Sequence, residues 1–411
     1  MVDGAESRQR RRLILENFLS REECRELEFI HKSCSTVGYR PNVFSTTLLH
    51  LVATNSAHLI IPFVPIREKL KEKAEEFFGC HYELFVEFTG LISLHSKAHL
   101  QPSSSNLGWT RGASIGWHSD DNRPYLKQRE FSAVCYLNSY GVEFGGGLFH
   151  FQDGEPETIS PFYGDCVMYT ADNDNVHSVD EITNGERLTL TLWFTRDSSH
   201  DEDAKLLSLL SQSPLHDRFP DSCLPQPPSC NMYWFSPEDD PNFKFGFDIC
   251  WARLRALGYD LYFPGDHDFS EYPDLFFQDV QLVWGDKIFF QKFENILHLL
   301  QVVQFLCWKG KELDSTNLSE DSSYAEYLSP KRNVGVSYFK SEFSKNDGLA
   351  ESVFSSAASD GKENQQWLGW DKLVAAAAAW EHYASILRRE LLGSFSHWRN
   401  CQSIYSVSLD S

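Results

Sequence analysis

Three residues near the middle of the chain have the types and spacing of a metal site: His118, Asp120 and His177. In an extended strand, residues two apart project from the same face, so His118 and Asp120 can bind one metal together. His177 lies 57 residues beyond Asp120, in a strand-like run, and can add a third ligand. Two histidines and one carboxylate leave three octahedral positions open, and that set selects non-haem Fe(II) in oxygenases. The alternative for the His-x-Asp pair alone is a surface histidine near a carboxylate.

Arg187 follows His177 by ten positions, across a turn at Thr183–Gly185. A three-residue hairpin loop with Gly185 in the left-handed conformation would pair His177 with Thr191. On that register Arg187 shares the face of His177, about four residues or on the order of 13 Å along the strand. The span fits 2-oxoglutarate chelated to iron, with its distal carboxylate bound by the guanidinium in a bidentate pair. The alternative is an ordinary edge strand whose polar face lies in water.

The surrounding sequence predicts a β domain flanked by helices. Ser20–Glu23 is a capping box and begins a helix that runs to about His31. Pro62–Phe78 predicts a second amphipathic helix, ended by Gly79. Strand-like runs follow at 82–94, 131–137, 147–151, 166–169, 176–182 and 188–195. Many short strands at this spacing favour a closed or two-sheet β structure.

We expect four regions along the chain. Residues 1–80 form an N-terminal helical flank of the catalytic domain, which spans 81–212. A linker rich in Pro, Ser and Asp covers 213–242, and residues 243–411 form a mainly helical C-terminal region. Within this last region we expect helices at 245–257, 286–308 and 370–392, and mobile Ser-, Asp- and Glu-rich segments at 313–332 and 344–366.

Composition limits the partners and the compartment. The chain has 37 basic and 58 acidic residues and a net charge of −21, so a phosphate backbone would repel it and we expect no nucleic-acid partner. The basic cluster Arg8–Arg12 predicts a solvated tail. We find neither an apolar run long enough for a bilayer nor the apolar core of a signal peptide, and expect no membrane partner. Ten scattered cysteines predict reduced thiols in a cytoplasmic or nuclear protein, with the oligomeric state left open.

Several segments resemble a known family. They are Arg129–Asn138, Phe144–Phe151, Asn175–Val179, Gly185–Arg187 and Leu192–Thr195. With the order of His-x-Asp, a distal His and then Arg, they resemble the 2-oxoglutarate oxygenase superfamily and, more closely, the catalytic domain of the prolyl 3-hydroxylases, the leprecan family. The likeness covers about residues 82–212. It implies an α+β fold with a catalytic double-stranded β-helix, or jelly roll, and flanking helices.

The resemblance also implies roles for single residues. The two histidines and the aspartate would hold Fe(II), and Arg187 would bind 2-oxoglutarate. Tyr136 matches a position whose hydroxyl helps to hold the same carboxylate, and its alternative is a core tyrosine in a strand. Thr189 is a weaker candidate for that carboxylate.

The function implied is that of an Fe(II)- and 2-oxoglutarate-dependent dioxygenase, procollagen-proline dioxygenase-like, which hydroxylates a prolyl residue of a protein or peptide, 3-hydroxylation being one form. 2-Oxoglutarate and O2 would be cosubstrates, and L-ascorbate would keep the iron reduced. The chain lacks the retention signal usual in the family, which favours an intracellular substrate. The loop 95–115 is expected to close over the peptide. Alternatives are a lysyl residue or a small molecule as substrate and, from another class, a non-catalytic interaction protein.

Overall fold

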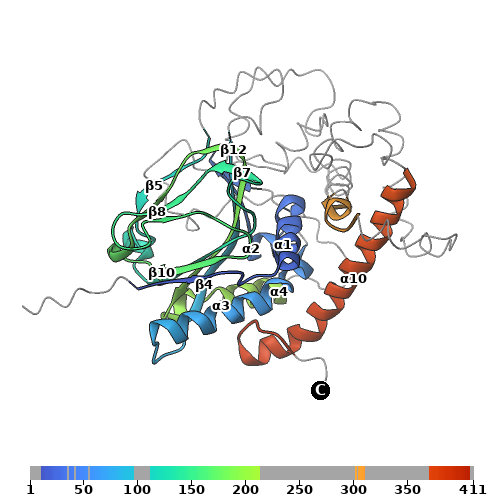
Figure 1. Cartoon of the computed structure of the whole chain (residues 1–411). Coiled ribbons are helices and arrows are strands. Elements are labelled where there is room, and N and C mark those ends of the chain that lie inside the picture. Colours follow the sequence, from blue (N-terminus) through green and yellow to red (C-terminus); the bar gives the residue numbers. More distant parts are fainter. Residues whose placement is uncertain are drawn as a thin grey trace, which may run out of the picture.

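The computed structural model describes residues 11–34, 37–40, 43–53, 56–96, 112–212, 301–302, 304–310 and 370–407. Within them, two antiparallel sheets face each other, and helices cover the outer face of the larger one (Figure 1). The large sheet has the order β1 (Arg12–Leu15), β10 (Cys166–Thr170), β6 (Arg129–Tyr136), β12 (Ile182–Thr195), β4 (Phe85–His95), β3 (Val43–Thr47) and β2 (Val37–Arg40), and β7 (Phe144–Gly146) also pairs with β12. The small sheet has the order β5 (Ile115–His118), β11 (His177–Val179), β8 (Phe149–Phe151) and β9 (Thr158–Ile159).

The described helices lie before, between and after these strands. They are α1 (Arg21–Cys34), α2 (Leu48–Ala53), α3 (Phe63–Phe78), α4 (Glu202–Gln212) and α10 (Trp370–Cys401). Short 3-10 helices are η1 (Ala57–Ile60), η3 (Pro124–Leu126), η4 (Asn173–Asn175) and η5 (Ser198–His200). Residues 301–302 and 304–310 are helical as well.

Strand β12 separates two hydrophobic cores. Leu188, Leu190 and Leu192 are buried in one cluster with apolar residues of α1, α3 and α4. Trp193 is buried in a second cluster with Phe149 of the small sheet. Because successive side chains point to opposite faces of a strand, β12 contributes to one core beneath the helices and to another between the sheets. The fold is therefore α+β, as predicted.

The first 80 residues are not only the helical flank that we predicted, because β1, β2 and β3 lie within them. β1 begins at Arg12, so the end of the predicted solvated tail is paired with β10. Strands of four or five residues are too short to show a clear periodicity, which is why the sequence did not reveal them.

The predicted start of the first helix and the predicted end of the second are confirmed, whereas α1 extends to Cys34, beyond the predicted end near His31. At the start of α1, the Ser20 N–H donates to the Glu23 carboxylate at 2.7 Å, and the Glu23 N–H donates to the Ser20 hydroxyl at 3.1 Å. Gly79 ends α3 in the left-handed conformation, with a φ of 66°.

The connection from His177 into β12 differs from the predicted hairpin. β11 pairs with β5 and β8 in the small sheet, whereas β12 pairs with β4 and β6 in the large sheet. His177 therefore lies opposite His118 and not opposite Thr191. Gly185 has the predicted left-handed φ, 70°, but lies within β12, where a Cβ would be 2.2 Å from the carbonyl oxygen of Glu143. Here the glycine allows a close approach of two strands, so a local turn signal did not mark a turn.

Part of the C-terminal region packs against α1. The rings of Phe305, Trp308, Trp380 and Tyr383 lie with their centroids 5.2 to 6.4 Å from that of Phe29. The predicted helix at 370–392 is confirmed as α10, which extends to Cys401 (red in Figure 1). Of the helix predicted at 286–308, only the end is described, and it is helical.

The remaining predictions for this region lie outside the described residues: the linker at 213–242, the helix at 245–257 and the segments at 313–332 and 344–366. The division into four regions thus stays a prediction. None of the described helices, α10 included, combines the length and apolar character needed to traverse a bilayer. The cytoplasmic or nuclear location stays a prediction too.

Candidate metal and cosubstrate site

The three predicted ligands lie close together at one end of the paired strands β5 and β11 of the small sheet. His118 ends β5 and His177 begins β11, and the pairing of these strands places the two residues opposite each other. Asp120 follows two residues later, and its Oδ1 lies 3.6 Å from Nε2 of His118 and 3.8 Å from Nε2 of His177. One candidate ligand atom from each residue lies within 4.8 Å of the others. A divalent metal between them would meet two nitrogens and one oxygen, so the donor set fits the non-haem iron that we predicted.

A bulge in β5 and a turn before β11 orient the two imidazoles. The register between β5 and β11 slips by one residue between Ile115 and His118, and the imidazoles of His118 and His177 both face the interior. His118 Nδ1 lies 2.8 Å from the Gly116 carbonyl oxygen, and His177 Nδ1 lies 2.9 Å from that of Asn175. Because a carbonyl oxygen can only accept, each Nδ1 carries the proton. The unprotonated Nε2 atoms face Asp120, as a metal requires.

Asp120 is held in its ionised form by contacts that the sequence reading did not anticipate. The Ser132 hydroxyl donates a short hydrogen bond to Oδ2, the oxygen turned away from the histidines. Arg129 Nη1 donates to the Asp120 carbonyl oxygen at 3.2 Å. Burial raises the pKa of Asp120, but His177, His118 and the Ser132 hydroxyl lower it more, and the net pKa lies below its usual range. Only the family-like Arg-x-Phe-Ser segment could have signalled these two contacts.

Arg187 lies between the two sheets. Its side chain is buried, and its guanidinium carbon lies 5.2 Å from the ring centre of Tyr136. Among the described residues, no carboxylate pairs with Arg187, and its Nε makes no hydrogen bond. The buried Tyr136 hydroxyl likewise makes no hydrogen bond in the described part of the chain. Two buried donors without acceptors are costly by themselves, so the pair fits a carboxylate ligand.

Thr189 faces the same interior but is otherwise engaged. It lies opposite Tyr136 in the register of β12 and β6. Its hydroxyl donates to the Ile92 carbonyl oxygen at 3.3 Å. A role for Thr189 in cosubstrate binding stays the weakest of the residue predictions.

Tyr169 is a site residue that the sequence reading missed. It lies in β10 and is buried, with its hydroxyl 3.3 Å from Nε2 of His177. Burial and the nearby Asp120 carboxylate raise its pKa well above the usual value, and Arg187 acts in the opposite direction. Tyr169 therefore interacts with both the ligand cluster and the arginine. Nothing in the sequence singled out Tyr169, because its pairing with Ser132 follows only from the strand register.

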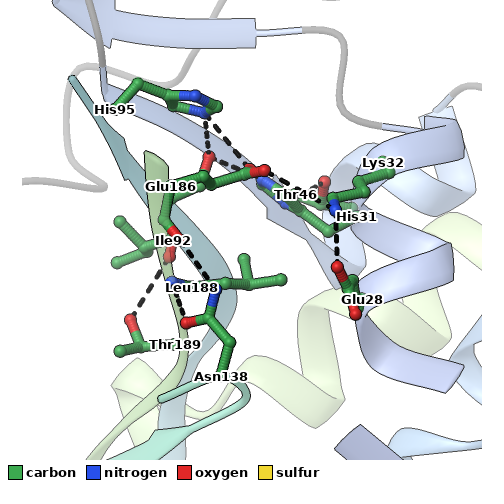
Figure 2. Close-up of polar contacts among 11 residues, drawn as sticks. Glu28, His31, Lys32, Thr46, Ile92, His95, Asn138, Glu186, Leu188 and Thr189 are labelled. Carbon is green, nitrogen blue, oxygen red and sulfur yellow. Dashed lines mark hydrogen bonds and ion pairs between the residues drawn. The ribbon is translucent and has the colours of Figure 1, made fainter. Parts of the chain in front are cut away.

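On the opposite face of β12, Glu186 belongs to a separate buried polar network under α1 (Figure 2). Its Oε1 lies 3.2 Å from Nε2 of His95, and its Oε2 lies 3.8 Å from Nζ of Lys32. The Asn138 amide donates to the Glu186 carbonyl oxygen at 2.7 Å and accepts from the Leu188 N–H at 3.0 Å. These bonds hold β12 on both sides of Arg187.

Residues 105–195 match the model of the 2OG-Fe(II) oxygenase superfamily. The matched segment is therefore similar to proteins of that superfamily. It contains His118, Asp120, His177 and Arg187.

Among curated proteins, the chain is similar to prolyl 3-hydroxylase 1 of Gallus gallus, with 26% identity over 220 residues, and to prolyl 3-hydroxylase 2 of Homo sapiens, with 27% identity over 226 residues. Each alignment covers 46% of this chain and 30% of the relative, so the chain matches less than a third of the length of these relatives. The predicted resemblance to the leprecan prolyl 3-hydroxylases is confirmed.

The solved structures that match part of the chain include two prolyl hydroxylases. One is a prolyl-4-hydroxylase of Pseudomonas putida, with a TM-score of 0.34 and 18% identity, covering 46% of this chain and 94% of that one. The other is a viral collagen prolyl hydroxylase from Paramecium Bursaria Chlorella virus-1, with a TM-score of 0.33 and 17% identity, covering 46% of this chain and 96% of that one.

Proposed function

We propose that this protein is an Fe(II)- and 2-oxoglutarate-dependent dioxygenase that hydroxylates a prolyl residue of a protein or peptide, on a jelly-roll domain. The observation that carries the proposal is that the metal ligands and the carboxylate-binding residues face the same space between the two sheets. The His-Asp-His cluster lies in and beside the small sheet, Arg187 and Tyr136 belong to the large sheet, and Tyr169 interacts with both groups.

Each side chain has a distinct task in this proposal. The two Nε2 atoms and Asp120 Oδ1 would hold the iron, and Arg187 and Tyr136 would bind the distal carboxylate of 2-oxoglutarate. When bound, the iron and 2-oxoglutarate supply the oxidation, in which O2 is consumed, 2-oxoglutarate becomes succinate and CO2, and a C–H bond becomes C–OH. Phe149 stacks on the His177 ring, with centroids 4.9 Å apart, and keeps water from one side of the ligand cluster.

The substrate class rests on the relatives. The relatives that align with this chain over 220 and 226 residues are named prolyl 3-hydroxylases, which supports a prolyl peptide and oxidation at its 3-position. L-Ascorbate would serve as the reductant, as the same resemblance implies.

The test is succinate release by the full chain with Fe(II), 2-oxoglutarate, ascorbate and a library of prolyl peptides, with a lysyl library in parallel. We expect release that depends on a prolyl peptide, together with a product that has gained one oxygen atom by mass spectrometry. Hydrolysis of the product and chromatography against authentic standards would separate 3- from 4-hydroxyproline.

Two variants make this test specific. Asp120→Ala should abolish succinate release, whereas Asp180→Ala, which removes a half-exposed aspartate paired with His150, should not. Release that depends on lysyl peptides alone would overturn the prolyl assignment. Metal binding without any turnover would favour the non-catalytic interaction protein.

A further inference from the structure

Arg12, in the first strand, connects the large sheet to the small one. It lies in β1 opposite Tyr169 of β10. Its Nη1 donates to the Pro156 carbonyl oxygen at 3.2 Å, and its Nη2 donates a short hydrogen bond to that of Asp153. Pro156 and Asp153 lie in the connection between β8 and β9 of the small sheet. A side chain that we expected in a solvated tail therefore joins the edges of the two sheets.

The same guanidinium holds the residue that orients His177. Arg12 Nε donates to Asn175 Oδ1 at 2.6 Å, and Asn175 Nδ2 donates to the Thr170 hydroxyl at 2.7 Å. Both ends of the Asn175 amide are thus fixed, and the residue is buried. The Asn175 carbonyl oxygen accepts the hydrogen bond from His177 Nδ1. An arginine, with several donors in a rigid planar group, can make all of these bonds at once.

Arg12 also braces the ring behind His177. Its guanidinium carbon lies 3.6 Å from the centre of the Phe151 ring, a cation–π contact. The Phe151 ring meets the His177 ring edge-on, with centroids 6.3 Å apart. Arg12 consequently reaches His177 by two routes, one polar through Asn175 and one apolar through Phe151.

We infer that Arg12 is a positioning residue for the metal ligand His177 and acts mainly through Asn175. This inference rests on the proposed metal site. Groups that hydrogen-bond to a ligating histidine orient its ring, and their loss commonly weakens metal affinity about 10- to 100-fold.

The experiment measures Co(II) affinity by the cobalt absorption spectrum in the full chain and in Arg12→Ala, Asn175→Ala and the double variant. We expect Arg12→Ala to weaken Co(II) binding on the order of tenfold, and the double variant to be little weaker than Asn175→Ala alone, because both changes break one route. Arg12→Lys should recover only part of the affinity, since an ammonium cannot span all the acceptors. Arg11→Ala is the matched control, because Arg11 donates to the Phe78 carbonyl oxygen, away from the ligands.

A merely structural role has a different signature. It would lower the thermal midpoint of the metal-free Arg12→Ala protein below that of Arg11→Ala and leave the Co(II) dissociation constant unchanged, which would overturn the inference. Additive losses in the double variant would overturn the route through Asn175. If the unmodified chain failed to bind Co(II), the metal site itself, and the inference with it, would be wrong.

Discussion

At the scale of single residues, the central feature is a buried cation, Arg187, with which no carboxylate pairs in the described part of the chain. Arg187 lies between the sheets near Tyr136, and burial lowers its pKa. Placing a guanidinium in a dry interior is unfavourable unless an anion accompanies it. We therefore interpret the unfavourable burial of Arg187 as a consequence of its proposed role, the binding of a carboxylate.

Arg187→Ala should weaken 2-oxoglutarate binding by about 3 kcal/mol, on the order of a hundredfold, because the ligand carboxylate loses its charged partner. Metal affinity should change little. Calorimetric titration of Mn(II) into the metal-free protein measures the metal affinity, and titration of 2-oxoglutarate into the Mn(II)-loaded protein measures the cosubstrate affinity. Arg196→Ala is the control, since Arg196 follows β12, is exposed and pairs with Glu130. Unchanged 2-oxoglutarate affinity in Arg187→Ala would remove this arginine from the site.

Ser132→Ala should weaken Co(II) binding about tenfold. The Ser132 hydroxyl holds Oδ2 of Asp120, and without it the carboxylate can rotate and no longer presents Oδ1 to the metal. The comparison is Ser211→Ala, which removes a hydroxyl bonded to the Leu207 carbonyl oxygen within α4. Equal Co(II) affinities of the two variants would show that Ser132 does not position the ligand.

At the scale of elements, β12 links the proposed site to the helical layer. Arg187 projects into the space between the sheets, while its neighbour Glu186 projects under α1 toward His95 and Lys32 (Figure 2). Burial raises the pKa of Glu186, but His95 and Lys32 lower it more, and the net pKa lies well below its usual value of 4.5. Glu186 is therefore ionised at neutral pH and ties β12 to β4 and α1.

The low pKa of Glu186 sets the sign of a pH effect. A carboxyl whose folded pKa is depressed contributes stability above its unfolded pKa, and that stability is lost as the pH falls from about 4.5 toward the folded value. Between pH 7 and pH 3, the free energy of unfolding of the unmodified chain should fall by about 2 kcal/mol more than that of Glu186→Gln. Denaturant titrations at both pH values measure this difference. Glu72→Gln, at an exposed position of α3, should follow the unmodified chain, and the same acid response in Glu186→Gln would contradict the prediction.

At the scale of the whole molecule, the C-terminal helix α10 is part of the core beneath the large sheet. Trp380 is buried and shares one cluster with Leu190 of β12 and Leu70 of α3. At the other end of α10, the Ile404 N–H donates to the Asp203 carboxylate of α4 at 2.8 Å. The helix thus contributes to the stability of the domain that carries the proposed site.

Trp380→Ala should reduce the free energy of unfolding by about 3 to 5 kcal/mol, because it leaves a cavity among Phe29, Phe305 and Tyr383. Leu392→Ala, at a 44% exposed position of the same helix, should cost far less. Denaturant unfolding followed by circular dichroism compares the two. A loss in Trp380→Ala no larger than in Leu392→Ala would mean that α10 adds little to the core.

The sequence alone determined what depends on nearby residues: the capping box at Ser20, the helix end at Gly79 and the residue types of the proposed iron site. It also showed that Arg187 shares a polar strand face. Apart from His177, which lies 57 residues beyond Asp120, these signals are local, because they depend on residues a few positions apart.

Only the tertiary structure decided which strands pair. It placed His177 opposite His118 in one sheet and Arg187 in the other, where the sequence had suggested one hairpin. It also brought Tyr169 next to the ligand His177, and Arg12 next to Asn175, whose carbonyl oxygen accepts from His177. Strand pairing joins residues far apart in the chain, and it is selected by how all the strands together bury their apolar faces, which no single segment records.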